Sequence, residues 1–506
     1  MATYRFGAFS LDTKAYRLCR GQKAMDVSAL QLELLAYLAA RPGRLLTRNE
    51  LFRDLWPGVA VTDNALTQLV SEVRGVLDDS PAAPRYIETV TRRGYRLIVP
   101  VEELEPDAAG APRATEARAV QTSNMDVLRS IFEGRLKLES LGAADIDAAI
   151  AQFGRAVQLD PTFAGGYIGL ANAKFWKYEL TRSHFQPDSA LLAAAIQDGR
   201  QAVLLAPSFA EAHGTLSYLL TASGRWDEAR AAARRAVTLQ PEFWAHHFRL
   251  GHATWGAERL RALANCLELY PAFGFAHFEM AMVHVARHAL DVARGVLREG
   301  AAIEARLGDG ERRFPANGLH WMLGAIALSQ GDSATAVAEC DRELAGAGRS
   351  LYAREFSVAA LNVRGFALLM DRDVDQAAET FQQSLAIDAE QVRPHIGLIQ
   401  VARVRGQTGQ SSEEHALAER AVTHLHRGGR AVEALIMEAA LHVVESHQSR
   451  ALATLVRVFE EAAPWAGWSI PIDPLFSSLR PLPEYESISR TLASRASSET
   501  GAPQPT

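Results

Sequence analysis

The sequence contains little cysteine and no long uninterrupted apolar run. Its three cysteines, Cys19, Cys266 and Cys340, lie far apart and in no Cys-x-x-Cys pair, which argues against both a disulfide framework and a zinc site. No stretch of about 18 consecutive apolar residues occurs, and the first residues lack the charged-then-apolar pattern of a secretory signal. These absences predict a protein that stays in the cytoplasm and makes no membrane contact.

The sequence also lacks the motifs of common catalytic and phosphate-binding sites. It contains no Gly-rich phosphate loop, no serine nucleophile elbow and no H-E-x-x-H. Several histidines crowd between residues 246 and 288, and His284 and His288 have the i, i+4 spacing of a two-histidine metal face. Because no third ligand set lies near them in the chain, we interpret them as surface or groove histidines. We therefore expect no enzyme activity, no cofactor and no bound metal.

The composition predicts a globular protein of several parts. Its 506 residues exceed one ordinary core, and 48% apolar with 22% charged residues is typical of a folded chain. Residues 1–101 carry 14 Lys/Arg and 10 Asp/Glu, a net +4, which leaves −10 for the rest of a chain whose total is −6. A basic segment before an acidic one suits a polyanion-binding module joined to a part that does not bind polyanions.

The first hundred residues predict a small sheet, three helices and a closing hairpin. Short, partly alternating runs between residues 4 and 27 indicate an antiparallel meander. A helix follows Ser28, and a second begins at the capping box formed by Thr47 and Glu50. Asp63 opens a third helix, and residues 86–99 then form two strands about a tight turn at Gly94.

This order of elements resembles the OmpR-type winged-helix DNA-binding domain. The resemblance rests on Leu45-Leu-Thr-Arg-x-Glu-Leu-x-x-x-Leu-Trp and on Arg93-Gly-Tyr-Arg, and it extends from Ser28 to Val99. It implies an N-terminal α+β winged helix-turn-helix domain over residues 1–101, with residues 63–79 as the recognition helix. It further implies that residues 57–62 correspond to a loop that contacts RNA polymerase in relatives.

The third helix is predicted to present polar side chains to DNA. A helix fits the major groove of B-DNA, and an inward apolar stripe leaves other positions on or near the outer face. These positions are Asn64, Thr67, Gln68, Ser71 and Arg74. The resemblance implies that Arg92 or Arg93 of the wing enters the minor groove, with Arg96 or Thr91 on phosphate. A merely solvated helix face is the alternative for single residues, and Glu72 departs from the family, in which arginine is common there.

The rest of the sequence predicts a linker and a repeat array. Residues 102–124 are rich in Glu, Pro, Ala, Gly and Thr without periodicity, which indicates a flexible linker. Over residues 125–470, similar Leu-x-Pro ends recur, and Pro207 to Pro241 spans the 34 residues of the tetratricopeptide period. Small or apolar consensus positions fall in register there at Leu216, Gly224, Ala229 and Ala236. The expected fold is an all-α tetratricopeptide-repeat solenoid of about eight repeats before residue 430, followed over 471–506 by a C-terminal cap and a disordered tail from residue 494.

Two functions are consistent with this organisation. The combined architecture resembles the HilA group of bacterial regulators and, without its membrane span, the CadC group. The resemblance implies a sequence-specific transcription regulator that binds double-stranded DNA at the nucleoid, as a possible homodimer, with a protein or small-ligand partner in the repeat groove. The alternative is a repeat scaffold whose winged helix contacts protein, which Glu72 and the acidic body favour.

Overall fold

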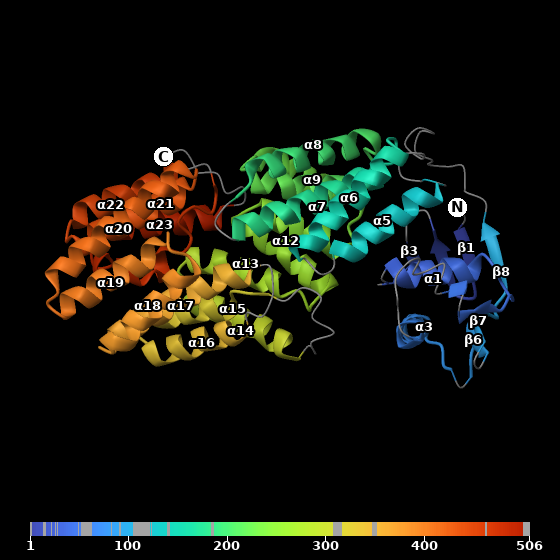
Figure 1. The fold of residues 1–506 in the computed structure, drawn as a ribbon, viewed down its shortest axis with the longest axis horizontal. Helices are drawn as coiled ribbons and strands as arrows, with labels where there is room; N and C mark the ends of the chain where they lie inside the picture. The colour runs from blue at the N-terminus through green and yellow to red at the C-terminus, as the bar shows by residue number, and fades with distance from the viewer. Residues whose placement is uncertain are drawn as a thin grey trace. The chain divides into compact units, whose positions relative to one another are not determined.

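The computed structural model divides the chain into two compact units, the head (residues 1–123) and the repeat unit (residues 124–506) (Figure 1). The described residues are 3–13, 17–21, 23–25, 27, 29–48, 50–51, 63–81, 83–90, 93–104, 122, 124–138, 142–183, 187–306, 316–346, 352–460 and 463–498. Most of the predicted linker and the whole of segment 57–62 therefore lie outside them. In the described part of the chain, no helix combines the length and the apolar character needed to cross a membrane.

The first sheet of the head confirms the predicted meander and adds a strand to it. Strands β1 (Thr3–Phe6), β2 (Phe9–Asp12), β3 (Arg17–Arg20) and β4 (Lys23–Ala24) pair antiparallel in sequence order. Strand β8 (Val101–Leu104) returns to the other side of β1, with Val101 opposite Phe6. The predicted linker start at residue 102 is therefore wrong by three residues, because pairing with a distant strand orders a Glu-rich segment.

The remaining elements of the head enclose its core. They are α1 (Ala29–Ala39), α3 (Asp63–Leu77), and a second sheet in the order β5 (Leu46–Thr47), β7 (Gly94–Leu97), β6 (Ile87–Val90). The predicted apolar stripe of α3 is confirmed as core, with each member at most 4% exposed: Leu66, Leu69, Val70, Val73 and Leu77. The predicted capping box is confirmed too, since Thr47 N–H donates to Glu50 Oε2 at 2.9 Å and Glu50 N–H donates to Thr47 Oγ1 at 3.2 Å.

The described residues of the repeat unit form helices and no strand, as expected, and successive α-helices pair. Eight pairs precede residue 430 and a ninth follows in the described part of the chain. The pairs are α5 (Met125–Leu138) with α6 (Ala143–Leu159), α7 (Ala164–Ser183) with α8 (Ser189–Leu205), α9 (Ala210–Ala222) with α10 (Trp226–Leu239), α11 (Trp244–Ala253) with α12 (Gly256–Leu269), α13 (Gly274–Ala286) with α14 (Leu290–Arg306), α15 (Leu319–Ser329) with α16 (Ser333–Gly346), α17 (Ala353–Met370) with α18 (Val374–Ile387), α19 (Val392–Val404) with α20 (Thr408–Arg427), and α21 (Ala431–Val444) with α22 (Gln448–Arg457).

Small residues allow the paired helices to approach closely. Phe381 is fully buried between Gly365 and Gly397, where an added Cβ would lie 2.5 Å and 2.3 Å from its ring. Gly224 forms the turn between α9 and α10 at φ +74°, a conformation that other residues rarely adopt. Gly224, a consensus position predicted from the sequence, thus lies at the turn between two paired helices.

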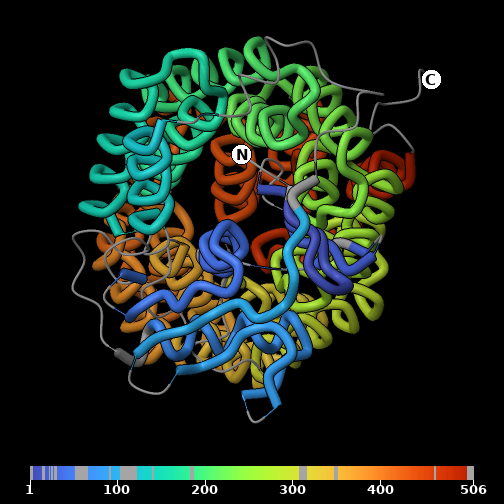
Figure 2. Tube along the Cα trace, turned by 90° about the vertical axis from the view of Figure 1, so that its right-hand side faces the viewer, coloured from blue at the N-terminus to red at the C-terminus, as the bar shows by residue number. Residues whose placement is uncertain are grey.

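The segment after α22 folds back onto the middle of the repeat unit. It comprises the 3₁₀ turns η1 (Val458–Glu460), η2 (Ile470–Ile472) and η3 (Pro474–Leu479) and helix α23 (Pro483–Ser497). Arg287 Nε donates to Ala496 O at 2.9 Å, and an Arg480 N–H donates to Ser329 O at 2.7 Å. Figure 2 shows the red C-terminal helix beside yellow-green helices from the middle of the unit. The predicted disordered tail is therefore wrong for residues 494–498, since Ala496 is fully buried.

Candidate nucleic-acid interface

Helix α3 carries an exposed polar face opposite its buried stripe. Thr67, Gln68 and Ser71 are all exposed on this face. An Arg48 N–H donates to Thr67 Oγ1 at 3.2 Å, and Gln68 Nε2 donates to Glu72 Oε1 at 3.2 Å. Hydroxyl and amide groups one helical turn apart can reach base edges or phosphates. The predicted Asn64 belongs to α3, but its side chain lies outside the described part.

Arg74 does not lie on that face. Its side chain is 8% exposed, and one guanidinium nitrogen donates to Ile87 O at 2.8 Å and to Thr89 Oγ1 at 2.7 Å. The prediction that Arg74 lies on or near the outer face is therefore wrong. Helical spacing placed the residue correctly on α3, but the neighbouring strand β6 supplies acceptors that draw the long side chain inward.

The same contacts fix the hairpin against the helix. Strand β6 is an edge strand, and the N–H and C=O of Ile87 point away from β7. Asp79, just after α3, accepts from Ile87 N–H at 2.8 Å and from Arg85 N–H at 2.6 Å. Arg74 and Asp79 thus satisfy both outward groups of Ile87. The distance between α3 and the β6–β7 hairpin is therefore set by one side chain of α3 and one that follows directly after it.

Strand β7, the second strand of the wing hairpin, begins at a position where only glycine fits. An added Cβ on Gly94 would lie 1.9 Å from Leu46 O, because β5 and β7 approach closely there. Arg93, directly before it, is exposed, and its carbonyl accepts from Arg48 N–H at 3.1 Å. This backbone bond connects the wing to the start of the capped second helix. The other predicted wing residues, Thr91 and Arg92, lie outside the described residues.

Two acidic side chains reduce the positive charge of this surface. Glu88 Oε2 accepts from Arg96 Nε at 2.8 Å, so the phosphate role predicted for Arg96 requires a shared or exchanged partner. Glu72 accepts from Gln68 and, at 3.0 Å, from Gln31 Nε2 of α1. Sequence reasoning missed Arg48 and Gln31 as members of this surface. The motif around Thr47 contains Arg48, but its approach to α3 is a tertiary contact.

The repeat unit has a polar cluster that joins two distant pairs. Tyr352 O–H donates to Glu179 Oε2 at 2.9 Å, and Arg182 lies 3.3 Å from Glu355. Burial disfavours the charge of Arg182, yet the carboxylates of Glu355 and Glu179 hold its pKa above the ordinary value. These residues connect α7 with α17. Any partner that binds at this cluster has to exchange contacts that the chain already makes with itself.

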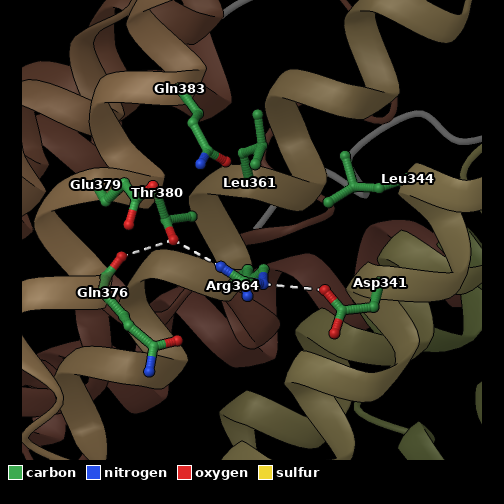
Figure 3. Close-up of a pocket in the computed structure, with 8 residues that line it drawn as sticks. All are labelled: Asp341, Leu344, Leu361, Arg364, Gln376, Glu379, Thr380 and Gln383. Atoms are coloured by element: carbon green, nitrogen blue, oxygen red, sulfur yellow. Dashed lines mark hydrogen bonds and ion pairs between the residues drawn. The ribbon is translucent and has the colours of Figure 1, made fainter.

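A surface pocket of about 310 Å³ lies between α16, α17 and α18 (Figure 3). Arg364 projects into it, but its guanidinium donates to Asp341 Oδ1 at 2.9 Å and to Thr380 Oγ1 at 2.7 Å. The charge of Arg364 is thus balanced by its own neighbours. This pocket therefore gives no specific indication of a charged ligand.

The histidine cluster between residues 246 and 288 is partly core. His246, His247 and His277 are buried, at 0%, 7% and 3% exposure, so their interpretation as surface or groove residues is wrong. His247 Nε2 lies 2.6 Å from Pro241 O, which ties α11 to the preceding turn. Packing of adjacent repeats covers these side chains, and a single repeat's sequence pattern does not reveal that burial.

Comparison with protein-family models finds a match within the head. Residues 21–97 match the family model described as "Transcriptional regulatory protein, C terminal". The "Cholera toxin homolog transcriptional activator" of Vibrio parahaemolyticus is 40% identical over 103 residues, 19% of this chain and 35% of that protein. The "Cholera toxin transcriptional activator" of Vibrio cholerae is 42% identical over 106 residues, 20% of this chain and 36% of that protein.

One solved structure shows a likeness to part of this chain. The DNA-binding domain of Escherichia coli CadC is 30% identical and has a TM-score of 0.19, covering 21% of this chain and 98% of that one. The chain spans about a third of the length of the two Vibrio relatives.

Proposed function

We propose that this chain is a sequence-specific DNA-binding transcription regulator. Residues 63–79 enter the major groove, and a wing arginine, Arg92 or Arg93, enters the minor groove. The repeat unit docks a protein or a small ligand whose binding changes how the head reaches DNA. The observation that carries the proposal is the exposed polar face of α3, held at a fixed distance from the wing by Arg74 and Asp79.

The chemistry of that face suits base reading. The amide of Gln68 has the donor and acceptor that pair with the N7 and N6 groups of adenine, in exchange for its bond to Glu72. The hydroxyls of Thr67 and Ser71 can bind bases or phosphates. Arg93, exposed beside the turn at Gly94, suits the negative potential of a narrow minor groove.

The relatives support the same function. Both Vibrio proteins are named as transcriptional activators, and each matches about a fifth of this chain. The matching solved structure is itself named as a DNA-binding domain. On this proposal the protein acts in the cytoplasm at the nucleoid, and residues 57–62 contact RNA polymerase. Pairing of heads as a homodimer would read two half-sites about one helical turn apart.

The test is selection of bound DNA from a random pool by the full-length protein. We expect an enriched motif whose affinity falls steeply with salt, since each neutralised phosphate contributes about 0.9 to the log–log slope. The variant Arg92→Ala/Arg93→Ala should weaken binding and lower the slope by one to two units. Arg298→Ala, on the exposed surface of α14, is the matched control and should change neither. No enrichment, with a flat salt response, would exclude DNA reading.

The alternative function is a scaffold whose head contacts protein. The placement of Glu72 on the face of α3, next to Gln68, favours it, because a carboxylate repels phosphates. In that case the selection returns no motif, and replacing Glu72 with arginine does not create one. A motif bound more tightly by Glu72→Arg would instead show that the carboxylate only moderates DNA affinity.

A further inference from the structure

Three histidines surround one glutamate at the last described helix pair. His442 lies in the final turn of α21, Glu445 directly follows that helix, and His447 precedes α22. His415 reaches the same carboxylate from α20. The backbone between them is fixed, since His447 N–H donates to His442 O at 2.8 Å and Ser446 adopts φ +65°. The pattern His442-x-x-Glu445-x-His447 therefore places three donor groups on one short, ordered turn.

The distances between these donor atoms match those around a small divalent ion. Nδ1 of His442 lies 3.1 Å from Glu445 Oε2, and Nδ1 of His447 lies 3.2 Å from the same oxygen. One ligand atom from each of the three residues lies within 4.8 Å of the other two. Metal–nitrogen and metal–oxygen bonds of about 2.0–2.2 Å at tetrahedral angles put neighbouring ligand atoms about 3.3–3.6 Å apart. An ion can therefore be bound with small side-chain movements.

Ordinary ion pairs between histidine and glutamate occur elsewhere in the unit and provide the comparison. His395 lies 2.6 Å from Glu414, and His320 lies 2.7 Å from Glu339. Each of those pairs brings one imidazole to one carboxylate. At Glu445, His415 Nε2 approaches Oε1 at 2.8 Å while two further imidazoles approach Oε2. The convergence of three imidazoles on one carboxylate distinguishes this cluster from the pairs.

The cluster is also open on one side. The side chains of His442 and Glu445 are 22% and 27% exposed, and that of His447 is 50% exposed. A bound ion would therefore keep access to water for its remaining ligand position.

We propose that His442, Glu445 and His447 form a binding site for a divalent transition metal of the zinc class. Imidazole with carboxylate is a donor set that such ions favour. His415 is a positioning residue, because it binds the other oxygen of Glu445 and orients the carboxylate toward the ion. An ion there connects the end of α21 with the residue before α22, and the bond between His415 and Glu445 connects that turn with α20. The sequence-based expectation of no bound metal considered His284 and His288 and overlooked this pattern.

The experiment uses full-length protein without a histidine tag, dialysed against chelator, and titrated with Zn²⁺ against a competing fluorescent indicator. We expect one equivalent to bind. His442→Ala and His447→Ala should each weaken binding by more than about a hundredfold, beyond the 10–100-fold typical of outer partners. His415→Ala should fall within that 10–100-fold range. The matched control His424→Ala, an exposed histidine of α20 that lies 2.9 Å from Glu390, should leave binding unchanged.

Titration with Co²⁺ identifies the ligand type. The proposal expects the visible bands of a nitrogen and oxygen site, without the charge-transfer band of cysteine ligands. Glu445→Gln keeps the shape of the side chain, so it removes the carboxylate with little risk to folding. The helical content of every variant is recorded to show that it is folded. The proposal is overturned if no stoichiometric ion binds, if the cobalt spectrum shows thiolate ligands, or if folded His442→Ala and His447→Ala variants bind zinc as tightly as the unchanged protein.

Discussion

Replacing Arg74 with leucine should lower the folding stability of the head without removing a contact to DNA. The guanidinium is buried and donates two hydrogen bonds to β6. Hydrogen bonds to charged groups contribute about 1.5–3 kcal/mol each, and leaving the Ile87 carbonyl unpaired costs about 1–3 kcal/mol. Part of this loss is offset, because the leucine variant has no guanidinium whose desolvation opposes folding. We expect Arg74→Leu to lower the free energy of unfolding of the head by about 2–4 kcal/mol.

Hydrogen–deuterium exchange of the full-length protein measures this change locally. Peptides covering residues 86–99 report opening of the hairpin, and each 1.4 kcal/mol is a tenfold change in the opening equilibrium. Amides that exchange through unfolding of the head should therefore exchange about 30–1,000 times faster in Arg74→Leu. Arg93→Ala is the matched comparison, because its exposed side chain should change exchange by less than about 0.5 kcal/mol in free energy.

In DNA binding the order should be reversed: Arg93→Ala should have the larger effect and Arg74→Leu the smaller one. At a temperature where the head remains folded, Arg74→Leu should keep the salt dependence of the unchanged protein. Arg93→Ala should lower the log–log slope by about one unit. The reasoning is refuted if Arg74→Leu leaves exchange unchanged but lowers the salt slope by about one unit, since Arg74 would then reach a phosphate.

Three further predictions concern other residues. The pKa of His246 is lowered to about 4, because burial disfavours its charge more than Glu211 favours it. As the pH falls below 6.5, the ordinary pKa of histidine, the unfolded chain takes up the proton before the folded protein does. The free energy of unfolding should therefore fall by up to about 3 kcal/mol between pH 6.5 and 4. Urea titrations of His246→Leu should lack this loss. Gly94→Ala should destabilise the head by more than about 2 kcal/mol in the same exchange assay, because its Cβ meets Leu46 O; unchanged exchange would contradict the close approach. Glu72→Gln should raise affinity for nonspecific DNA at low salt in fluorescence anisotropy, and equal affinity would show that α3 lies away from phosphates.

Features of the head that depend on nearby residues could be predicted from the sequence. The capping box of Thr47 and Glu50 and the buried stripe of α3 follow from spacings within a few residues, and both are confirmed. The exposed positions of Thr67, Gln68 and Ser71 follow from the same helical period. The inward turn of Arg74 could not be predicted in this way, because its acceptors lie 13 and 15 residues away on a strand whose edge faces the helix.

In the repeat unit, too, local features could be predicted from the sequence and long-range contacts could not. Its paired helices and glycine turns follow from the 34-residue period, and the eight pairs before residue 430 agree with the prediction. The contact between Tyr352 and Glu179 joins residues 173 positions apart, and no repeat consensus contains it. The approach of His415 to Glu445 could not be predicted either, since His415 lies 30 positions away on a different helix, whereas the local pattern His442-x-x-Glu445-x-His447 was present in the sequence and overlooked.

The return of the C-terminal segment to the middle of the repeat unit affects the order in which the chain can fold during synthesis. Arg287 donates a hydrogen bond to the carbonyl of Ala496, 209 residues later in the chain. The ring of Trp226 in α10 packs edge-on against that of Trp465, with the ring centroids 4.4 Å apart. Helices α10 to α15 leave the ribosome long before these partners exist, so their apolar inner surface stays uncovered through the synthesis of the later pairs. Contacts of such long range also slow folding after release. The nascent repeat unit is thus most exposed to aggregation, and most in need of a chaperone, before residues 458–498 emerge.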